Sequence, residues 1–115
     1  MLTSDHARSM LAECGRAVDY VAETGEAVPT RAVVTVFGFG SAPSGFDADL
    51  FDGLGYHASF RLAVSDHPEP PVYGDEIAFE TRLYEIRQVD ALPRTSTPIW
   101  WRLRCVAEQR GSSPA

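Results

Sequence analysis

Residues that could bind phosphate or act as a nucleophile are present, but they lack the spacing that this chemistry needs. Gly38, Gly40 and Gly45 do not match the G-x-G-x-x-G pattern, and no lysine follows them as in a phosphate-binding loop. Ser44 lacks the flanking pair of glycines that marks a nucleophile elbow. These patterns therefore predict neither nucleotide binding nor a serine nucleophile.

The acidic residues that follow only partly resemble a calcium-binding loop. Asp47, Asp49 and Asp52 supply carboxylates, but Phe51 occupies the third ligand position and Ala58 the place of the closing glutamate. A calcium loop needs oxygen ligands at both places. We interpret the segment as a solvated acidic loop.

The three histidines give no catalytic or zinc pattern. His6, His57 and His67 are scattered over a helix start, a strand edge and a proline-rich turn, so we expect all three at the surface. Asp75 and Glu76 begin a strand, where a carboxylate most often accepts hydrogen bonds from turn amides. The sequence predicts no enzyme activity, no catalytic residue, no cofactor and no metal.

Composition indicates one domain with an acidic balance. The chain has 115 residues, with 16 acidic and 10 basic side chains and a formal charge of −6. Such a charge does not favour gripping DNA, because that affinity comes from lysine and arginine displacing counterions. Cys14 and Cys105 lie in apolar segments and are expected to be buried free thiols. Met1–Asp5 lacks the features of a signal peptide and no apolar run reaches a membrane span, so we expect a soluble intracellular protein.

The stretch around which the chain is organised runs from Val72 to Val89. Ile77 and Phe79 alternate with polar or small residues, and Tyr84 and Ile86 do so after a break, which is the period of half-buried strands. A hairpin is predicted although its turn, Glu80-Thr81, lacks the Asn-Gly or Asp-Gly signature. Gly74-Asp75, after the proline-rich residues 67–71, resets the direction of the chain before it.

The other elements complete a small β domain. A helix is predicted over 5–14, with Met10, Leu11 and Cys14 on one side and Gly15 as its stop. Together they predict a mainly β fold, a small barrel or sandwich of about six strands with a short N-terminal helix. The predicted parts are the helix 5–14, a first strand pair over 16–37 with a turn at Gly25, an extended arm 38–57, the remaining strands in 58–107, and a flexible tail 108–115. The expected inward face is Val33 or Val34 with Phe60, Leu62, Ile77, Phe79, Tyr84, Ile86, Trp101 and Leu103.

The arm 38–57 is unusual because it combines five glycines with aromatic residues and aspartates. Long irregular stretches inside a compact domain are commonly functional, and this one has too many aromatic residues for a solvated linker. Trp100 stands beside two arginines on the last strand, and such residues are enriched at protein interfaces. Trp100 could equally cover an edge of its own barrel. The expected assembly interface is Phe39, Phe46, Leu50, Phe51, Leu54, Tyr56 and Trp100.

The order of these elements resembles that of tailed-phage head-tail joining proteins, the small neck proteins of the lambda-type joining and connector (stopper-like) families. The residues that carry the resemblance are Tyr73–Phe79, the two-residue turn, and Leu83–Val89. Gly15–Tyr20 and Arg31–Val34 also fit, so that the resemblance covers roughly Gly15 to Glu108. The chain departs from the pattern by lacking Asp-Gly at the hairpin turn and by its Trp100-Trp101 pair.

This resemblance implies a β-barrel subunit without an active site. Such subunits form a homo-oligomeric ring, a hexamer or dodecamer, that joins the portal of the DNA-filled head to the tail and helps retain the genome. The implied partners are portal or adaptor and tail proteins, with packaged DNA passing without sequence-specific contact and no membrane. The implied location is the virion neck, and the host cytoplasm during assembly. A tail-terminator or tail-completion protein, or a stand-alone small β-barrel binding module, are the alternatives.

Overall fold

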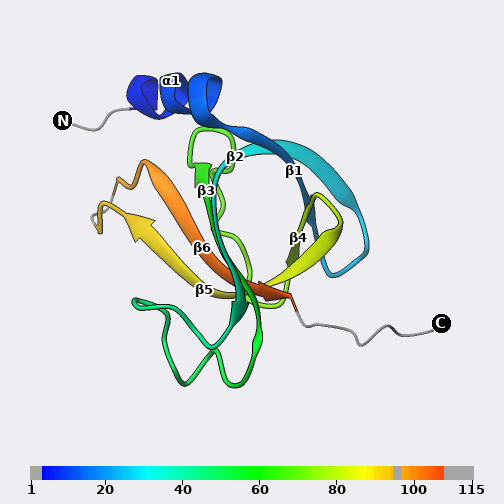
Figure 1. Cartoon of the computed structure of the whole chain (residues 1–115). Coiled ribbons are helices and arrows are strands. Elements are labelled where there is room, and N and C mark those ends of the chain that lie inside the picture. The colour runs from blue at the N-terminus through cyan, green and yellow to red at the C-terminus, as the bar shows by residue number, and fades with distance from the viewer. Residues whose placement is uncertain (1–3, 95–96, 108–115) are drawn as a thin grey trace.

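A computed structural model describes residues 4–94 and 97–107 (Figure 1). Within these residues one helix precedes six strands: α1 (Ser4–Cys14), β1 (Arg16–Val21), β2 (Ala27–Gly40), β3 (Gly55–Ala63), β4 (Glu76–Phe79), β5 (Arg82–Leu92) and β6 (Trp100–Ala107). The strands close into a barrel in the order β1-β2-β3-β6-β5-β4, and each neighbouring pair is antiparallel. The predicted fold class is confirmed, and the barrel is the correct form of it. The predicted tail 108–115 lies outside the described residues.

The interior of the barrel is filled from alternate positions of the strands. Phe60 lies at its centre, with its ring 6.0 Å from that of Phe79 and 5.4 Å from that of Tyr84. The predicted inward face is confirmed, with Val34 rather than Val33 turned toward this core. The core also takes in residues that were not predicted: Val18, Ala32, Ala58 and Ala107.

The predicted hairpin is the pair β4–β5, with Glu80-Thr81 as its two-residue turn. Glu80 has a φ of 56°, so the first central residue takes the left-handed conformation that tight hairpins require, although it is not a glycine. Ahead of the hairpin, Gly74 also has a positive φ and its amide donates to the carbonyl oxygen of Ile86. Strand β5 continues to Leu92, past the predicted end of the stretch.

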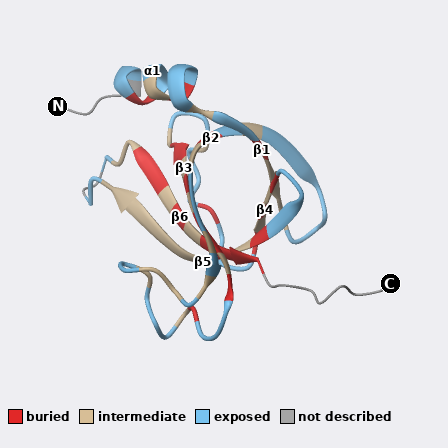
Figure 2. Cartoon of the chain, viewed as in Figure 1, coloured by how far each residue is buried: buried red, intermediate tan, exposed pale blue. Residues whose placement is uncertain are grey.

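Helix α1 covers one end of the outer wall of the barrel. Ala7 and Leu11 pack on Ala63 and Trp100, which form a second, smaller core. Met10 is half-buried against the same core, and most of the remaining helix surface is exposed, drawn pale blue in Figure 2. The chain leaves the helix at Gly15, where a Cβ atom would lie only 2.4 Å from the carbonyl oxygen of Leu11. Glycine is therefore required at the predicted stop.

Cys14 is exposed, whereas the prediction placed both cysteines in the interior. Cys14 is the last residue of α1 and lies beyond the contact with Trp100, so the apolar stripe of the helix has nothing beneath it there. Cys105 is buried in the barrel core as predicted, and both thiols are free. Burial raises the pKa of the Cys105 thiol well above its ordinary value.

Residues 36–40 of β2 pair with residues 55–58 of β3 and lead to the bottom of Figure 1, opposite α1, and we call these two segments the extension. Residues 56–58 of β3 also pair with β6, whereas residues 36–40 of β2 have no partner on their other side. The arm predicted to be irregular over 38–57 is irregular only over residues 41–54, here called the tip. Gly38, Phe39 and Gly40 pair with His57, Tyr56 and Gly55. A register shift between Val36 and Gly38 lets the ladder continue, and Gly38 has a φ of 81°. Glycines that suggested a loop therefore serve a bulge and the end of a ladder.

Candidate functional site

The residues predicted to form an assembly interface divide into an exposed and a buried group. Phe39 and Leu54 are 48% and 65% exposed, and Phe46, Leu50 and Tyr56 are half-buried. Trp100 is only 1% exposed beneath α1, and Phe51 is buried as well. Trp100 and Phe51 are thus covered by their own chain in the subunit, and the assembly interface itself stays a prediction. The alternative for Trp100, that it covers an edge of its own barrel, is the correct one.

The tip folds back onto the outer wall and buries a histidine. The rings of Phe46 and Phe51 lie 5.6 and 5.9 Å from the imidazole of His57, and 4.8 Å from each other. His57 is 1% exposed, so its predicted surface position is wrong. Burial lowers the pKa of His57 below its ordinary value, which keeps the imidazole neutral at neutral pH.

The extension and the last residue of the tip carry exposed apolar side chains. Among the described residues, half of the eight exposed large apolar side chains lie there: Val36, Phe37 and Phe39 on the extension and Leu54 at the end of the tip. The ring of Phe37 also contacts that of Phe46 in the tip, at 5.4 Å. The ring of Phe39 lies 5.2 Å from that of Tyr56, whose face carries the guanidinium of Arg82 at 3.7 Å. The aromatic pair therefore has a fixed position at the surface. We call Val36, Phe37, Phe39 and Leu54 the apolar patch.

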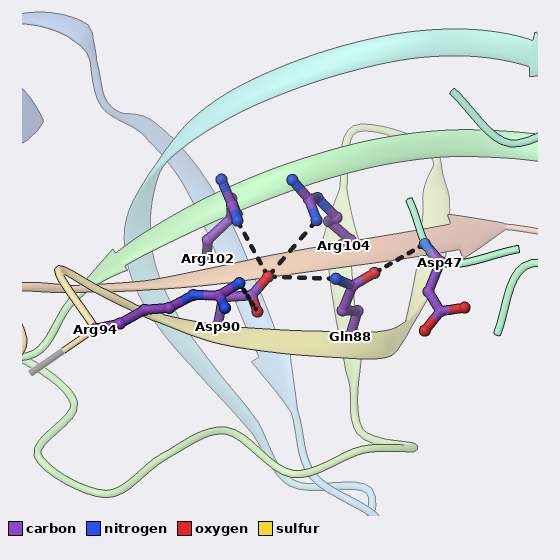
Figure 3. Close-up of polar contacts among 6 residues, drawn as sticks. All are labelled: Asp47, Gln88, Asp90, Arg94, Arg102 and Arg104. Atoms are coloured by element: carbon purple, nitrogen blue, oxygen red, sulfur yellow. Dashed lines mark hydrogen bonds and ion pairs between the residues drawn. The ribbon is translucent and has the colours of Figure 1, made fainter. Parts of the chain in front are cut away.

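A cluster of charged side chains occupies the outer wall between α1 and the tip (Figure 3). The carboxylate of Asp90 on β5 lies 3.2 Å from Arg102 and 3.6 Å from Arg104 on β6. Its other oxygen pairs with the exposed Arg94 at 3.4 Å. Gln88 donates to Asp90 and accepts a hydrogen bond from the backbone amide of Asp47, which ties the tip to the wall.

Arg102 and Arg104 of this cluster line a recess of about 260 Å³ on the outer wall. Its polar lining is Arg61, Arg102, Arg104, Thr35, Ser44 and Ser59, and its apolar lining is Val33, Phe37 and Phe46. Burial and the neighbouring Arg102 lower the pKa of Arg104. The alternation on β6 had placed Trp100, Arg102 and Arg104 on one face. The recess itself was not predicted, because it depends on the register that sets Arg61 beside Arg102.

A second pocket, of about 510 Å³, lies under the proline-rich segment and is lined by Tyr20, His67, Asp75 and residues of that segment. The hydroxyl of Tyr20 donates to Asp75 at 2.6 Å, and the Glu23 amide donates to the other carboxylate oxygen at 3.1 Å. Burial and the hydrogen bond to Asp75 raise the pKa of Tyr20 to about 12. Asp75 thus binds a turn amide, as predicted, although the turn lies far away in the sequence.

His67 lines the same pocket, but its imidazole hydrogen-bonds to Thr30 on β2. Its Nε2 lies 2.9 Å from the hydroxyl oxygen of Thr30, and burial lowers its pKa. The indole of Trp101 donates to the backbone carbonyl oxygen of His67 at 2.6 Å. These contacts and those of Tyr20 tie the proline-rich segment to the barrel, which is a structural role.

The part of the chain that the structure describes contains no group of three histidine, cysteine or acidic side chains placed to hold a metal ion. None of its helices has the length and apolar character needed to cross a membrane. Neither the models of known protein families nor the curated proteins match this chain.

Proposed function

We propose that this chain is a structural subunit of a phage neck. In this role copies of the barrel form a ring that joins the portal of the DNA-filled head to the tail and helps retain the genome. The observation that carries the proposal is the apolar patch on an extension that projects from a closed barrel (Figure 1). The resemblance of the hairpin to head-tail joining proteins supplies the particular assembly.

The closed barrel restricts how copies can associate. Each described strand has a partner on both sides over part of its length, but residues 33–40 of β2 lie past the pairing with β1 and pair only with β3. Contacts between subunits can therefore use side chains or this strand edge. The apolar patch holds four of the eight exposed large apolar side chains among the described residues, and exposed apolar patches favour burial against another protein. A patch that meets a different surface of the next copy gives a head-to-tail contact, which closes into a ring when the rotation permits.

The charge of the chain agrees with a DNA passage. A net charge of −6 opposes tight contact with phosphates, so DNA can slide through a ring of such subunits without being held. Portal or adaptor proteins on the head side and tail proteins on the other side are then the partners. The proposed location is the virion neck.

The test uses the virus whose genome encodes the chain. Phe39→Ser and Leu54→Ser together should leave a folded monomer that no longer completes heads or joins tails, scored as infectious particles in a complementation assay. Val72→Ser with Leu83→Ser is the matched control, because both residues are comparably exposed but lie off the extension. Deleting the tip is a poorer test, since it would uncover His57. Normal particle yield from the patch variant would overturn the proposal.

The neighbouring genes separate the proposal from its alternatives. A neck subunit should be encoded between portal or capsid genes and tail genes, and it should bind the portal in a pull-down with purified proteins. Binding to the tail tube instead would identify a tail-terminator or tail-completion protein. A monomer that binds neither, encoded far from phage genes, would be a stand-alone β-barrel binding module.

A further inference from the structure

The arginine recess is built from two neighbouring rows of residues that run across four strands. One row is Val33, Arg61, Arg102 and Asp90, and the next is Thr35, Ser59, Arg104 and Gln88. Side chains directly opposite on neighbouring strands point to the same face of a sheet. Three guanidinium groups and two hydroxyls are thus brought together on one face by the register.

The recess is walled on both sides by the segments that cover the outer wall. Val33 packs on the small core under α1, and Ser44 and Phe46 of the tip close the opposite side. The side chains of Arg102 and Arg104 are only 22% and 15% exposed. Charges held this far from water interact more strongly with a bound ion than they would on an open surface.

The charges of the recess are not balanced by the chain. Asp90 is the one carboxylate that forms ion pairs with its arginines among the described residues, and it does not reach Arg61. The Nε of Arg102 is buried and has no hydrogen-bond partner in the described part of the chain. Three guanidinium groups against one carboxylate leave an excess of two positive charges in a chain whose net charge is −6.

We propose that this recess binds a phosphate monoester that carries a flat apolar group. A phosphate monoester has close to two negative charges at neutral pH and three acceptor oxygens, which match the charge excess and the arginine and hydroxyl donors. A carboxylate would neutralise only half of that excess. The remaining space is lined by Val33, Phe37 and Phe46, which suit an apolar or aromatic substituent. This inference does not rest on the neck function, although Phe37 belongs both to the recess lining and to the apolar patch.

Phenyl phosphate is a suitable probe and should be titrated into the purified chain by calorimetry at neutral pH. Inorganic phosphate tests the charge without the ring, and benzoate tests the ring with a single charge. We expect phenyl phosphate to bind most tightly of the three. The absence of phenyl phosphate binding at millimolar concentration, or binding of benzoate as tightly, would overturn the proposal.

Variants locate the ligand in the recess. Arg104→Gln and Arg61→Gln should each weaken phenyl phosphate binding about tenfold or more, because a charge-assisted hydrogen bond is lost. Arg94→Gln is the matched control: it makes the same charge change beside the same carboxylate, but Arg94 is 76% exposed and lies outside the recess lining. Asp90→Asn should tighten binding, because a competing carboxylate is removed. Thermal melts show which variants stay folded. Arg61 has no ion pair to Asp90, so Arg61→Gln can still test the site if Arg104→Gln does not fold. Equal affinity of the folded Arg61→Gln and Arg94→Gln variants would overturn the assignment.

Two sources could supply such a ligand, a free nucleotide or the phosphorylated end of a nucleic acid. Adenosine monophosphate and a short oligonucleotide with or without a terminal phosphate distinguish them in the same titration. Competition with phenyl phosphate by adenosine monophosphate alone identifies a free nucleotide. Competition by the oligonucleotide only when it is phosphorylated identifies a nucleic-acid end. Failure of both to compete would contradict a nucleotide ligand, and equal competition by the unphosphorylated oligonucleotide would contradict a monoester site.

Discussion

Helix α1 and the tip cover opposite ends of the same outer wall, but they are held there by different means. The helix buries Trp100 with two side chains spaced one turn apart, Ala7 and Leu11. The tip has neither helix nor strand and buries His57 with the rings of Phe46 and Phe51. Two hydrogen bonds anchor it to β5, from the Asp47 amide to Gln88 and from Arg87 to the carbonyl oxygen of Leu50. The comparison shows that a regular stripe and a cluster of aromatic rings can each bury a large side chain on the outside of a barrel.

The largest effect is expected from removing the side chain that the helix covers. Trp100→Ala should lower the free energy of unfolding by about 3–5 kcal/mol, because a large buried side chain is replaced by a cavity under α1. Urea denaturation of the two proteins measures the difference. Trp100→Phe should lose clearly less, since the ring still fills most of the space. A loss below about 1 kcal/mol for the alanine variant, within the range of a surface change, would show that α1 is not a stabilising cover.

A change in the helix stop should cost less, because it disturbs only how α1 is attached. Gly15→Ala places a Cβ against the carbonyl oxygen of Leu11, and overpacking of this kind costs about 1–3 kcal/mol. The amides of α1 should then exchange with solvent faster than those of the barrel strands, as hydrogen-exchange measurements can show. Gly25→Ala is a useful comparison, because the Cβ there meets no atom within 4 Å and any cost comes from its φ of 90°, in the turn between β1 and β2. Unchanged exchange in α1 would contradict the steric role of Gly15.

Acid should loosen the tip more than the helix. The pKa of His57 in the folded chain is below the ordinary 6.5 because of burial, so the unfolded chain binds the proton more readily. The stabilisation is present above about pH 6.5 and is lost as the pH falls below it, at roughly 1.4 kcal/mol for each pKa unit of depression. Urea midpoints at neutral and mildly acid pH measure this loss.

His67 has a lowered pKa for the same reason, so it contributes in the same direction. The pH dependence should therefore shrink in His57→Gln and shrink again when His67→Gln is added. A double variant whose midpoints change with pH as much as those of the unaltered chain would refute this explanation.

The smallest effect on stability is expected on the open side of the extension. Phe39→Ser should change the free energy of unfolding by about 0.5 kcal/mol or less, because the side chain is largely exposed in the subunit. Phe51→Ser, in the tip, should cost several times more, because Phe51 is buried. If Phe39→Ser proved as destabilising as Phe51→Ser, the patch would be part of the fold and not a surface reserved for a partner.

The barrel could be predicted from the sequence because strands β4, β5 and β6 place large apolar residues at alternate positions. Ile77, Phe79, Tyr84 and Ile86 show the period of two, and one face of the resulting sheet had to be buried. The same alternation placed Trp101 and Leu103 inside. The secondary-structure prediction was wrong at two glycines. Gly38 and Gly40 suggested a loop, but both lie in β2, where one follows a bulge in the pairing with β3 and the other ends that pairing.

The contents of the outer wall depended on information that a single sequence does not carry. The burial of His57 requires the tip to fold back, and nothing local to His57 indicates this. Arg61 and Arg102 are far apart in the sequence and meet only because β3 pairs with β6 in one register. Alternation shows which side of a strand faces outward, but the alignment between strands decides which outward residues become neighbours.

The place of β6 between β3 and β5 also has a consequence for synthesis of the chain. As the ribosome releases the chain, β3 and β5 are present before the strand that pairs with both, so each exposes an unpaired edge that favours association with other chains. The barrel can close only after Ala107 has left the exit tunnel. Ribosome-bound chains of increasing length should thus become resistant to protease in a single step at that point, and resistance gained before β6 emerges would show that the other strands fold without it.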